Sequence, residues 1–312
     1  MRELHDLQAL ENAFVLSTVH DHSFGFAGHL SHPNIRRGNV NKMGHVSCRL
    51  PLSVRSAGAL VRYDLDPEGD GHPLLLVHGG RAHHGWWQHL LPLLTEPRAV
   101  MDLSGHGASE WRDAYSYDDW AGDVTRVAEA CALRTGRQIV VVAHSLGGIA
   151  ALQPSVRMND AVLAVISVEG VPMPSLSIRR SSSPSRGFTS IESALEHFRR
   201  ARDRGRWRQD LVDSVALASI RRDGDRYDWA HDPRTVGVPH PRSIDSAPSP
   251  AAVLVGAQSA YRATVDDALS AGPAWLSRIE VPGVGHDMMM EAPERFVTTV
   301  REVVRSVTVD RG

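Results

Sequence analysis

The feature that most constrains the fold is a regular alternation of short apolar runs with helical segments, which begins near residue 47. Apolar runs of this length that end in glycine or polar residues are typical of buried strands. Strands separated by helices form parallel sheets that are covered on both faces. The expected strands are 73–80, 98–107, 137–145, 160–170, 250–256 and 274–283, and the expected helices are 86–95, 116–134, 146–156, 261–270 and 292–307. With a hairpin at 53–66, the pattern predicts an α/β protein with a mostly parallel, doubly wound sheet.

The alternation stops once, between residues 173 and 248. This stretch is rich in Ser, Arg, Pro and Asp, and two helices are plausible in it, near 189–204 and 209–222. An insertion between two strands of one sheet predicts a cap over the carboxyl edge, where open α/β sheets bind ligands. We therefore expect one core, formed by residues 47–172 and 249–312, and a cap or lid formed by residues 173–248.

Residues 1–46 show no clean periodicity and contain six of the seventeen histidines. No metal-ligand spacing is present among them, so a poorly ordered extension is expected rather than a metal-binding tail.

The composition is that of an ordinary globular protein. The 312 residues carry a formal charge of −2, with 42% hydrophobic and 22% charged residues, so no nucleic-acid or membrane partner is expected. No run approaches the roughly 18 apolar residues of a membrane span. Cys48 and Cys131 are too few for a disulfide framework, which favours a reducing, cytoplasmic location. A monomer or homodimer is expected.

The stretch "VVAHSLGGIAAL" (141–152) places Ser145 between an expected strand and an expected helix. A nucleophile elbow requires small neighbours, because the backbone at its serine is strained and closely packed. The usual pattern is G-x-S-x-G, whereas Ala143 occupies the first small position here. Ser145 is therefore a candidate nucleophile, with a structural turn serine as the alternative.

Four segments together resemble the α/β-hydrolase superfamily: "LLLVHGG", "MDLSGHGAS", "VVAHSLGG" and "VPGVGHDMMMEAPERF". They span residues 74–296 in the order found in that family. The resemblance implies the α/β-hydrolase fold, with the cap inserted after the strand that follows the nucleophile helix.

The resemblance also implies a base and an acid for Ser145. His286, in "GVGHDMM", matches the family's catalytic histidine. Many relatives place an Asp where this chain has Ser259, and a hydroxyl cannot supply the negative charge. Glu169, in "VISVEGVP", occupies a second position used within the superfamily, and pairing with His286 would offset the cost of a charge beside the core. Asp266 and Asp267 are the alternative acids.

The expected oxyanion donors are the backbone amides of Gly80 and Leu146, with Arg81 in place of Gly80 as the fallback. Three side chains are candidates for the pocket lining: Arg81, His144 and Trp87. For Trp87, packing on the sheet is the main expectation and the pocket lining is the alternative. No metal or organic cofactor is expected, since the adjacent pair His83 and His84 lacks a carboxylate or cysteine pattern.

These features predict a serine hydrolase that cleaves a small or medium carboxylic ester or lactone through a Ser-His-Glu triad. Two alternatives remain at this point. One is hydrolysis of a carbon–carbon bond in a diketone, as some capped relatives perform. The other is a small-molecule-binding receptor on the same fold, because such receptors can retain the triad.

Overall fold

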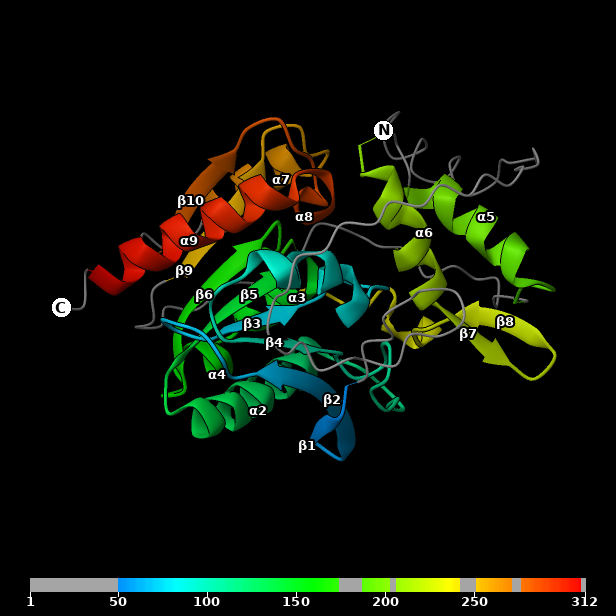
Figure 1. The fold of residues 1–312 in the computed structure, drawn as a ribbon, viewed down its shortest axis with the longest axis horizontal. Helices are drawn as coiled ribbons and strands as arrows, with labels where there is room; N and C mark the ends of the chain where they lie inside the picture. Colours follow the sequence, from blue (N-terminus) through cyan, green and yellow to red (C-terminus); the bar gives the residue numbers. More distant parts are fainter. Residues whose placement is uncertain (1–49, 174–186, 203–205, 242–250, 271–275, 310–312) are drawn as a thin grey trace, which may run out of the picture.

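A computed structural model describes residues 50–173, 187–202, 206–241, 251–270 and 276–309. Its centre is an eight-stranded sheet in the order β1-β2-β4-β3-β5-β6-β9-β10 (Figure 1). The strands are β1 (Leu52–Ser56), β2 (Ala59–Asp66), β3 (Leu74–Val77), β4 (Arg98–Met101), β5 (Ile139–His144), β6 (Val162–Val168), β9 (Ala251–Gly256) and β10 (Leu276–Val281). β2 pairs antiparallel with β1 and with β4, and the other pairings of this sheet are parallel. The predicted mostly parallel sheet and its hairpin are thus confirmed.

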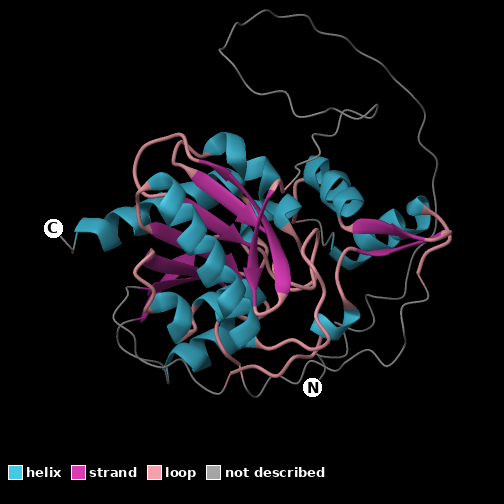
Figure 2. Cartoon of the chain, turned by 90° about the horizontal axis from the view of Figure 1, so that it is seen from below, coloured by secondary structure: helices cyan, strands magenta, loops and turns pink. Residues whose placement is uncertain are grey.

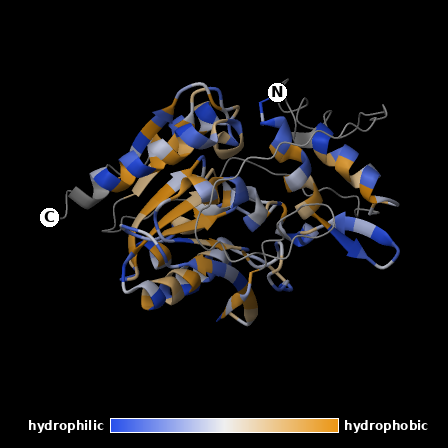
Figure 3. Cartoon of the chain, in the orientation of Figure 1, coloured by the Kyte–Doolittle hydropathy of each residue, from blue (hydrophilic) through white to orange (hydrophobic). Residues whose placement is uncertain are grey.

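One face of the sheet is covered by α2 (Tyr117–Thr135), α3 (Leu146–Ala151), α4 (Pro154–Arg157) and α7 (Arg262–Ser270) (Figure 2). Every second side chain of a buried strand points to this side, as the strand period of two requires. In β5, for example, Val141 and Ala143 belong to this layer, whereas Val140 and Val142 belong to the other. The hydropathy colouring shows these apolar strands enclosed by helices that turn polar surfaces outward (Figure 3).

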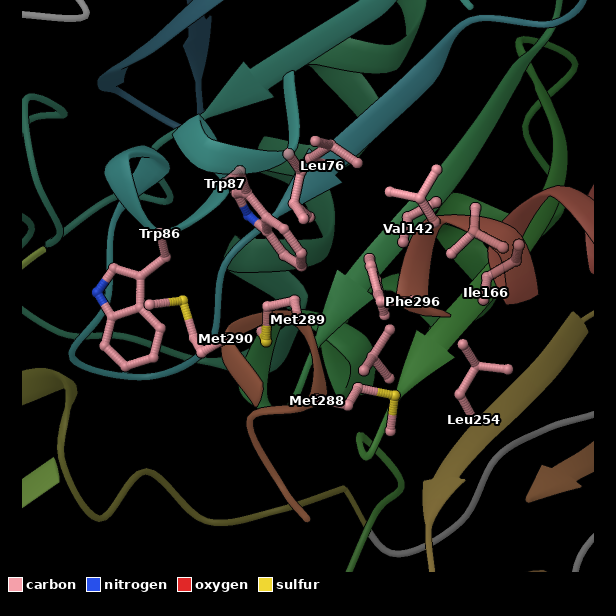
Figure 4. Close-up of a cluster of buried hydrophobic side chains, with 14 of the residues drawn as sticks. Leu76, Trp86, Trp87, Val142, Ile166, Leu254, Met288, Met289, Met290 and Phe296 are labelled. Carbon is pink, nitrogen blue, oxygen red and sulfur yellow. The ribbon is translucent and has the colours of Figure 1, made fainter. Parts of the chain in front are cut away.

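The opposite face is covered by η1 (His84–Leu93), α8 (Met288–Glu291) and α9 (Pro293–Val309). The helix predicted at 86–95 is present as the 3₁₀ helix η1, and Pro92 lies inside it. Figure 4 shows Trp87 and Phe296 packed over strand residues such as Val142 and Ile166. The rings of Trp87 and Phe296 stack at 6.0 Å, which closes this layer between η1 and α9.

The insertion between β6 and β9 contains α5 (Ile191–Arg202), α6 (Gln209–Ala218), the antiparallel pair β7 (Ile220–Asp223) and β8 (Arg226–Trp229), and the short η2 (Pro233–Thr235). The helix expected to run to residue 222 is wrong at its end, because it stops at Ala218 and β7 follows. The cause is a turn at Asp223-Gly224-Asp225, where Gly224 has φ +61°. Asp223 pairs with Arg226, which leaves Gly224 and Asp225 as a two-residue loop, and glycine at the first loop position favours a tight hairpin over a continuing helix.

The insertion is joined to the core next to the carboxyl edge of the sheet. The backbone nitrogen of Gly107 donates to the carbonyl of Ala230 at 2.6 Å, and that of Asp232 donates to the carbonyl of Gly105 at 2.7 Å. The Tyr115 hydroxyl also donates to Asp232 Oδ2 at 2.9 Å. The loop after β4 therefore fixes the position of residues 230–232 next to this edge. Residues 1–46 and the rest of the insertion lie outside the described residues.

Among the residues that the structure describes, no helix combines the length and the apolar character needed to span a bilayer.

Candidate active site

Ser145 lies at the junction between β5 and α3, at φ +49° and ψ −114°. This turn is possible because Gly147 and Gly148, two and three residues later, have no side chains. A Cβ on Gly147 would clash with the backbone oxygen of His78, and one on Gly148 would clash with Ser167 Oγ. Ser145 itself is held by its backbone nitrogen, which donates to the Val168 carbonyl at 2.8 Å. The geometry is that of a nucleophile elbow, which presents its hydroxyl at the strand end.

Three residues of this region share an unfavourable backbone conformation. Ser145, Glu169 and Arg81 have φ of +49°, +56° and +59°, and Ala57 is the only other non-glycine residue with positive φ in the described part of the chain. Such conformations cost on the order of 1–3 kcal/mol each and persist where the surrounding structure imposes them. Their concentration around one serine indicates a site built for a function.

The His286 imidazole reaches Glu169 from the loop that follows β10. Its Nδ1 lies 3.1 Å from Glu169 Oε2, and the carboxylate is fully buried whereas the imidazole is partly exposed. A carboxylate at Nδ1 fixes the tautomer that leaves Nε2 to act as the proton acceptor. The structure thus brings together the histidine and the first of the predicted acids.

Two further donors satisfy the Glu169 carboxylate. The backbone nitrogen of Gly256 donates to Oε1 at 2.6 Å, and Ser259 Oγ donates to Oε2 at 2.5 Å. Ser259 occupies the position at which many relatives have an aspartate. Its hydroxyl donates a hydrogen bond to the carboxylate, so Ser259 supports Glu169 instead of replacing it.

Asp266 and Asp267, the alternative acids, lie on α7 away from this pair. Asp266 forms an ion pair with Arg278, with Nε and Oδ1 at 2.6 Å, and Asp267 is exposed. Asp266 is held by Arg278 and Asp267 is exposed, so the geometry offers Glu169 as the acid for His286.

Ser145 and His286 line one cavity of about 190 Å³. Gly80 and Leu146, the two residues expected to supply the oxyanion donors, also line this cavity. They lie close together, since a Cβ built on Gly80 would be 3.4 Å from Leu146 Cδ1. Leu146 also begins helix α3, so its backbone nitrogen is one of the amides without a partner inside the helix. The serine, the imidazole and the two expected donors therefore share one small space.

The three candidate pocket residues have different positions. Arg81 lines the cavity. His144 is buried beside it, and its Nε2 lies 3.1 Å from the backbone oxygen of His286, so it supports the loop that carries the imidazole. Trp87 is absent from the cavity lining and is fully buried in the layer between η1 and α9, so it packs on the sheet and does not line the pocket (Figure 4).

Within the described residues, one group has the composition of a metal site: His144, His286 and Asp287 offer ligand atoms within 4.8 Å of one another. An ion held there would compete for His286, which the geometry pairs with Glu169.

A cluster of buried histidines supports the loop that carries Gly80. Burial, followed by the neighbouring His106, lowers the pKa of His78 to about 3, and burial lowers the pKa of His83 and His106 to about 4. Burial alone would raise the pKa of Asp102, but His84, whose Nδ1 lies 2.9 Å from it, outweighs that effect and holds the pKa well below its usual range. His83 and His84 are thus structural here, bonded to Ser219 and Asp102 respectively.

The strand order, the strained serine after β5 and the insertion after β6 define the class of α/β hydrolases. This chain belongs to the alpha/beta hydrolase family, whose model matches residues 74–299. The solved E-2-(acetamidomethylene)succinate hydrolase has a similar fold, with a TM-score of 0.63 and 18% identity over 80% of this chain and 98% of that one. The solved M. tuberculosis esterase Rv0045c also reaches 0.63, at 20% identity over 83% and 94%. The predicted fold is thereby confirmed.

Curated relatives match shorter stretches. Esterase Rv0045c of Mycobacterium tuberculosis is 30% identical over 104 residues, which are 33% of this chain and 35% of that protein. The 2-hydroxymuconate semialdehyde hydrolase of Pseudomonas sp. (strain CF600) is 31% identical over 52% of this chain and 59% of its own length. The chain therefore spans about a third of the first of these relatives and three fifths of the second.

Proposed function

We propose that this protein is a serine hydrolase that cleaves a carboxylic ester or lactone. The observation that carries the proposal is the contact between His286 Nδ1 and the buried Glu169 carboxylate beside the strained Ser145. The esterase among the relatives supports the same reaction class.

In this mechanism Ser145 Oγ attacks the carbonyl carbon while His286 Nε2 takes the hydroxyl proton. The amides of Gly80 and Leu146 hold the oxyanion of the tetrahedral intermediate. Protonated His286 then gives its proton to the leaving alcohol, and an acyl-enzyme remains. Water, deprotonated by His286, attacks the acyl-enzyme and releases the acid, and Ser145 recovers its proton. Glu169 stays ionised and stabilises the imidazolium in both halves of the reaction.

A fluorophosphonate probe together with a panel of nitrophenyl esters and lactones tests this function. The wild-type protein is expected to bind the probe covalently and to turn over at least one substrate many times. Ser145→Ala is expected to lose both properties. Labelling of the variant at another residue, or equal turnover by both proteins, would contradict the proposal, and a single slow release of a retained ligand would favour a receptor.

A second candidate reaction is hydrolysis of a carbon–carbon bond in a diketone. The relative named 2-hydroxymuconate semialdehyde hydrolase favours it, since the match to it covers half of this chain. Spectroscopic assay of a vinylogous diketone distinguishes the two reactions. Cleavage of the diketone much faster than any ester would assign the chain to the second.

A further inference from the structure

The cavity beside Ser145 is mostly apolar, with Ile149, Met173, Val236 and Val238 among its lining residues. Polar side chains also line the cavity: besides Ser145, His286, Arg81, Thr235 and Tyr261, they include Tyr117 and His240. Their rings meet edge to face with centroids 5.4 Å apart, although Tyr117 belongs to α2 and His240 belongs to the insertion between β6 and β9. Polar groups in a partly apolar pocket commonly fix the orientation of a ligand.

The Tyr117 side chain is only 6% exposed, yet its hydroxyl has no hydrogen-bond partner among the described residues. By comparison, the hydroxyl of Tyr115, two residues earlier, has two hydrogen-bond partners. It accepts from the backbone nitrogen of Arg112 and donates to Asp232, both at 2.9 Å. Burial raises the pKa of Tyr117 well above its ordinary value, so the hydroxyl keeps its proton. Tyr117 borders the cavity, so its hydroxyl is available to donate a hydrogen bond to a ligand oxygen there.

His240 presents a second donor to the same cavity. Its Nδ1 accepts from the backbone nitrogen of Met173 at 3.2 Å, so the proton of the neutral ring is on Nε2. Burial lowers the pKa of His240, which keeps the ring neutral near pH 7. The Nε2–H has no protein partner among the described residues. Tyr117 and His240 thus offer two neutral donors and no charge.

We propose that Tyr117 and His240 form a subsite for a second, uncharged oxygen of the substrate, such as a ketone, ether or hydroxyl oxygen. The preferred substrate is therefore an oxygenated ester rather than a purely aliphatic one. This inference rests on the proposed hydrolase function, because it identifies the substrate class of that same site. The subsite contributes binding and specificity, while the bond-breaking step stays with Ser145 and His286.

Two isosteric substrate pairs test the subsite. Nitrophenyl levulinate against nitrophenyl valerate places the extra oxygen in the acyl chain, and methoxyethyl acetate against butyl acetate places it in the alcohol. The measured quantity is the ratio of kcat/KM within each pair, with Ser145→Ala as the blank. A ratio of about ten in one pair is expected for wild type, since a neutral hydrogen bond contributes about 0.5–1.5 kcal/mol and two are available.

Tyr117→Phe and His240→Leu are each expected to bring that ratio close to one, whereas His240→Gln, which can keep an N–H donor, is expected to retain part of it. Tyr115→Phe is the matched control, because it removes a tyrosine hydroxyl that does not border the cavity, and it should leave the ratio unchanged. The ratio is insensitive to a partial loss of folded enzyme.

A ratio near one in both wild-type pairs would overturn the subsite while leaving the hydrolase intact. A ratio that survives both Tyr117→Phe and His240→Leu would do the same. A strong preference for a succinate half-ester would also overturn it, because that result assigns the selection to a cation such as Arg81. Failure of every substrate, together with no fluorophosphonate labelling, would instead contradict the hydrolase function.

Discussion

Ser259 Oγ lies 2.5 Å from Glu169 Oε2, the same oxygen that His286 Nδ1 approaches at 3.1 Å. Two positions on different strand ends, β6 and β9, therefore converge on one point behind the imidazole. The acid occupies one of them and a hydrogen-bond donor occupies the other. Because the donor supports the charged form of its neighbour, the pair provides one carboxylate and avoids the repulsion between two.

The first prediction concerns the acid itself. Glu169→Gln is expected to lower kcat by roughly 10³–10⁴-fold, because an amide cannot stabilise the imidazolium and disturbs the tautomer of His286. Asp266→Asn is the matched control and should leave kcat near the wild-type value, since its ion pair is partly exposed. Steady-state kinetics on one ester measures both, and the reverse order of effects would place the acid on α7.

The second prediction uses the convergence of Ser259 and Glu169. In a Glu169→Gln background, Ser259→Asp is expected to restore kcat by about tenfold or more, because it returns a carboxylate to the neighbourhood of Nδ1. Ser259→Asn in the same background should restore nothing. If the aspartate and asparagine variants behave alike, the two positions are not interchangeable.

The third prediction concerns close packing at the elbow. Gly147→Ala is expected to destabilise the protein by about 1–3 kcal/mol and to reduce activity, because the new methyl group meets the His78 carbonyl oxygen. Gly122→Ala in α2 is the control: its Cβ would find Ser56 Oγ at 3.5 Å, an ordinary contact, and helix propensity favours alanine. Thermal unfolding checks both, and equal shifts would show that the elbow tolerates a side chain.

The fourth prediction separates backbone strain from chemistry at Ser145. Both Ser145→Gly and Ser145→Ala should be inactive, but the glycine variant should be more stable than the alanine variant by about 1 kcal/mol. Only glycine adopts a φ of +49° without steric cost. Chemical denaturation of the two inactive proteins measures the difference, and a more stable alanine variant would argue against strain here.

The fifth prediction follows from the buried histidines His78, His83 and His106, whose pKa values are lowered to about 3, 4 and 4. These rings stay neutral in the folded state, whereas the unfolded chain takes up protons below its ordinary pKa of about 6.5. The contribution of these histidines to the free energy of unfolding should therefore have its full value above pH 6.5. It should fall as the pH drops toward 4, by up to about 1.4 kcal/mol per pH unit for each group. Calorimetry across this range tests it, and a constant Tm would contradict it.

The sequence allows much of this arrangement to be predicted, for a local reason. Each buried strand is a contiguous apolar run, and Ser145, Glu169 and His286 all follow strands, so their meeting at one edge follows from parallel pairing. The direction in which Trp87 turns depends on packing between distant elements, and no local pattern encodes it.

The sequence pattern does not predict two other features. The hairpin after Ala218 had a local signal in Asp223-Gly224, which the apolar pattern of the preceding helix obscured. Tyr117 and His240 meet only because the insertion returns across α2, so neither could be linked to the other from its own neighbours.

The positive φ values of Arg81, Ser145 and Glu169 have a consequence for engineering. Each is a position where glycine relaxes the chain, so a library selected purely for heat resistance should accumulate glycine at all three. Such a library would lose catalysis as it gained robustness. A library selected for activity should instead keep the original residues at these positions. The positions at which the two libraries differ would therefore identify the active site without a known substrate.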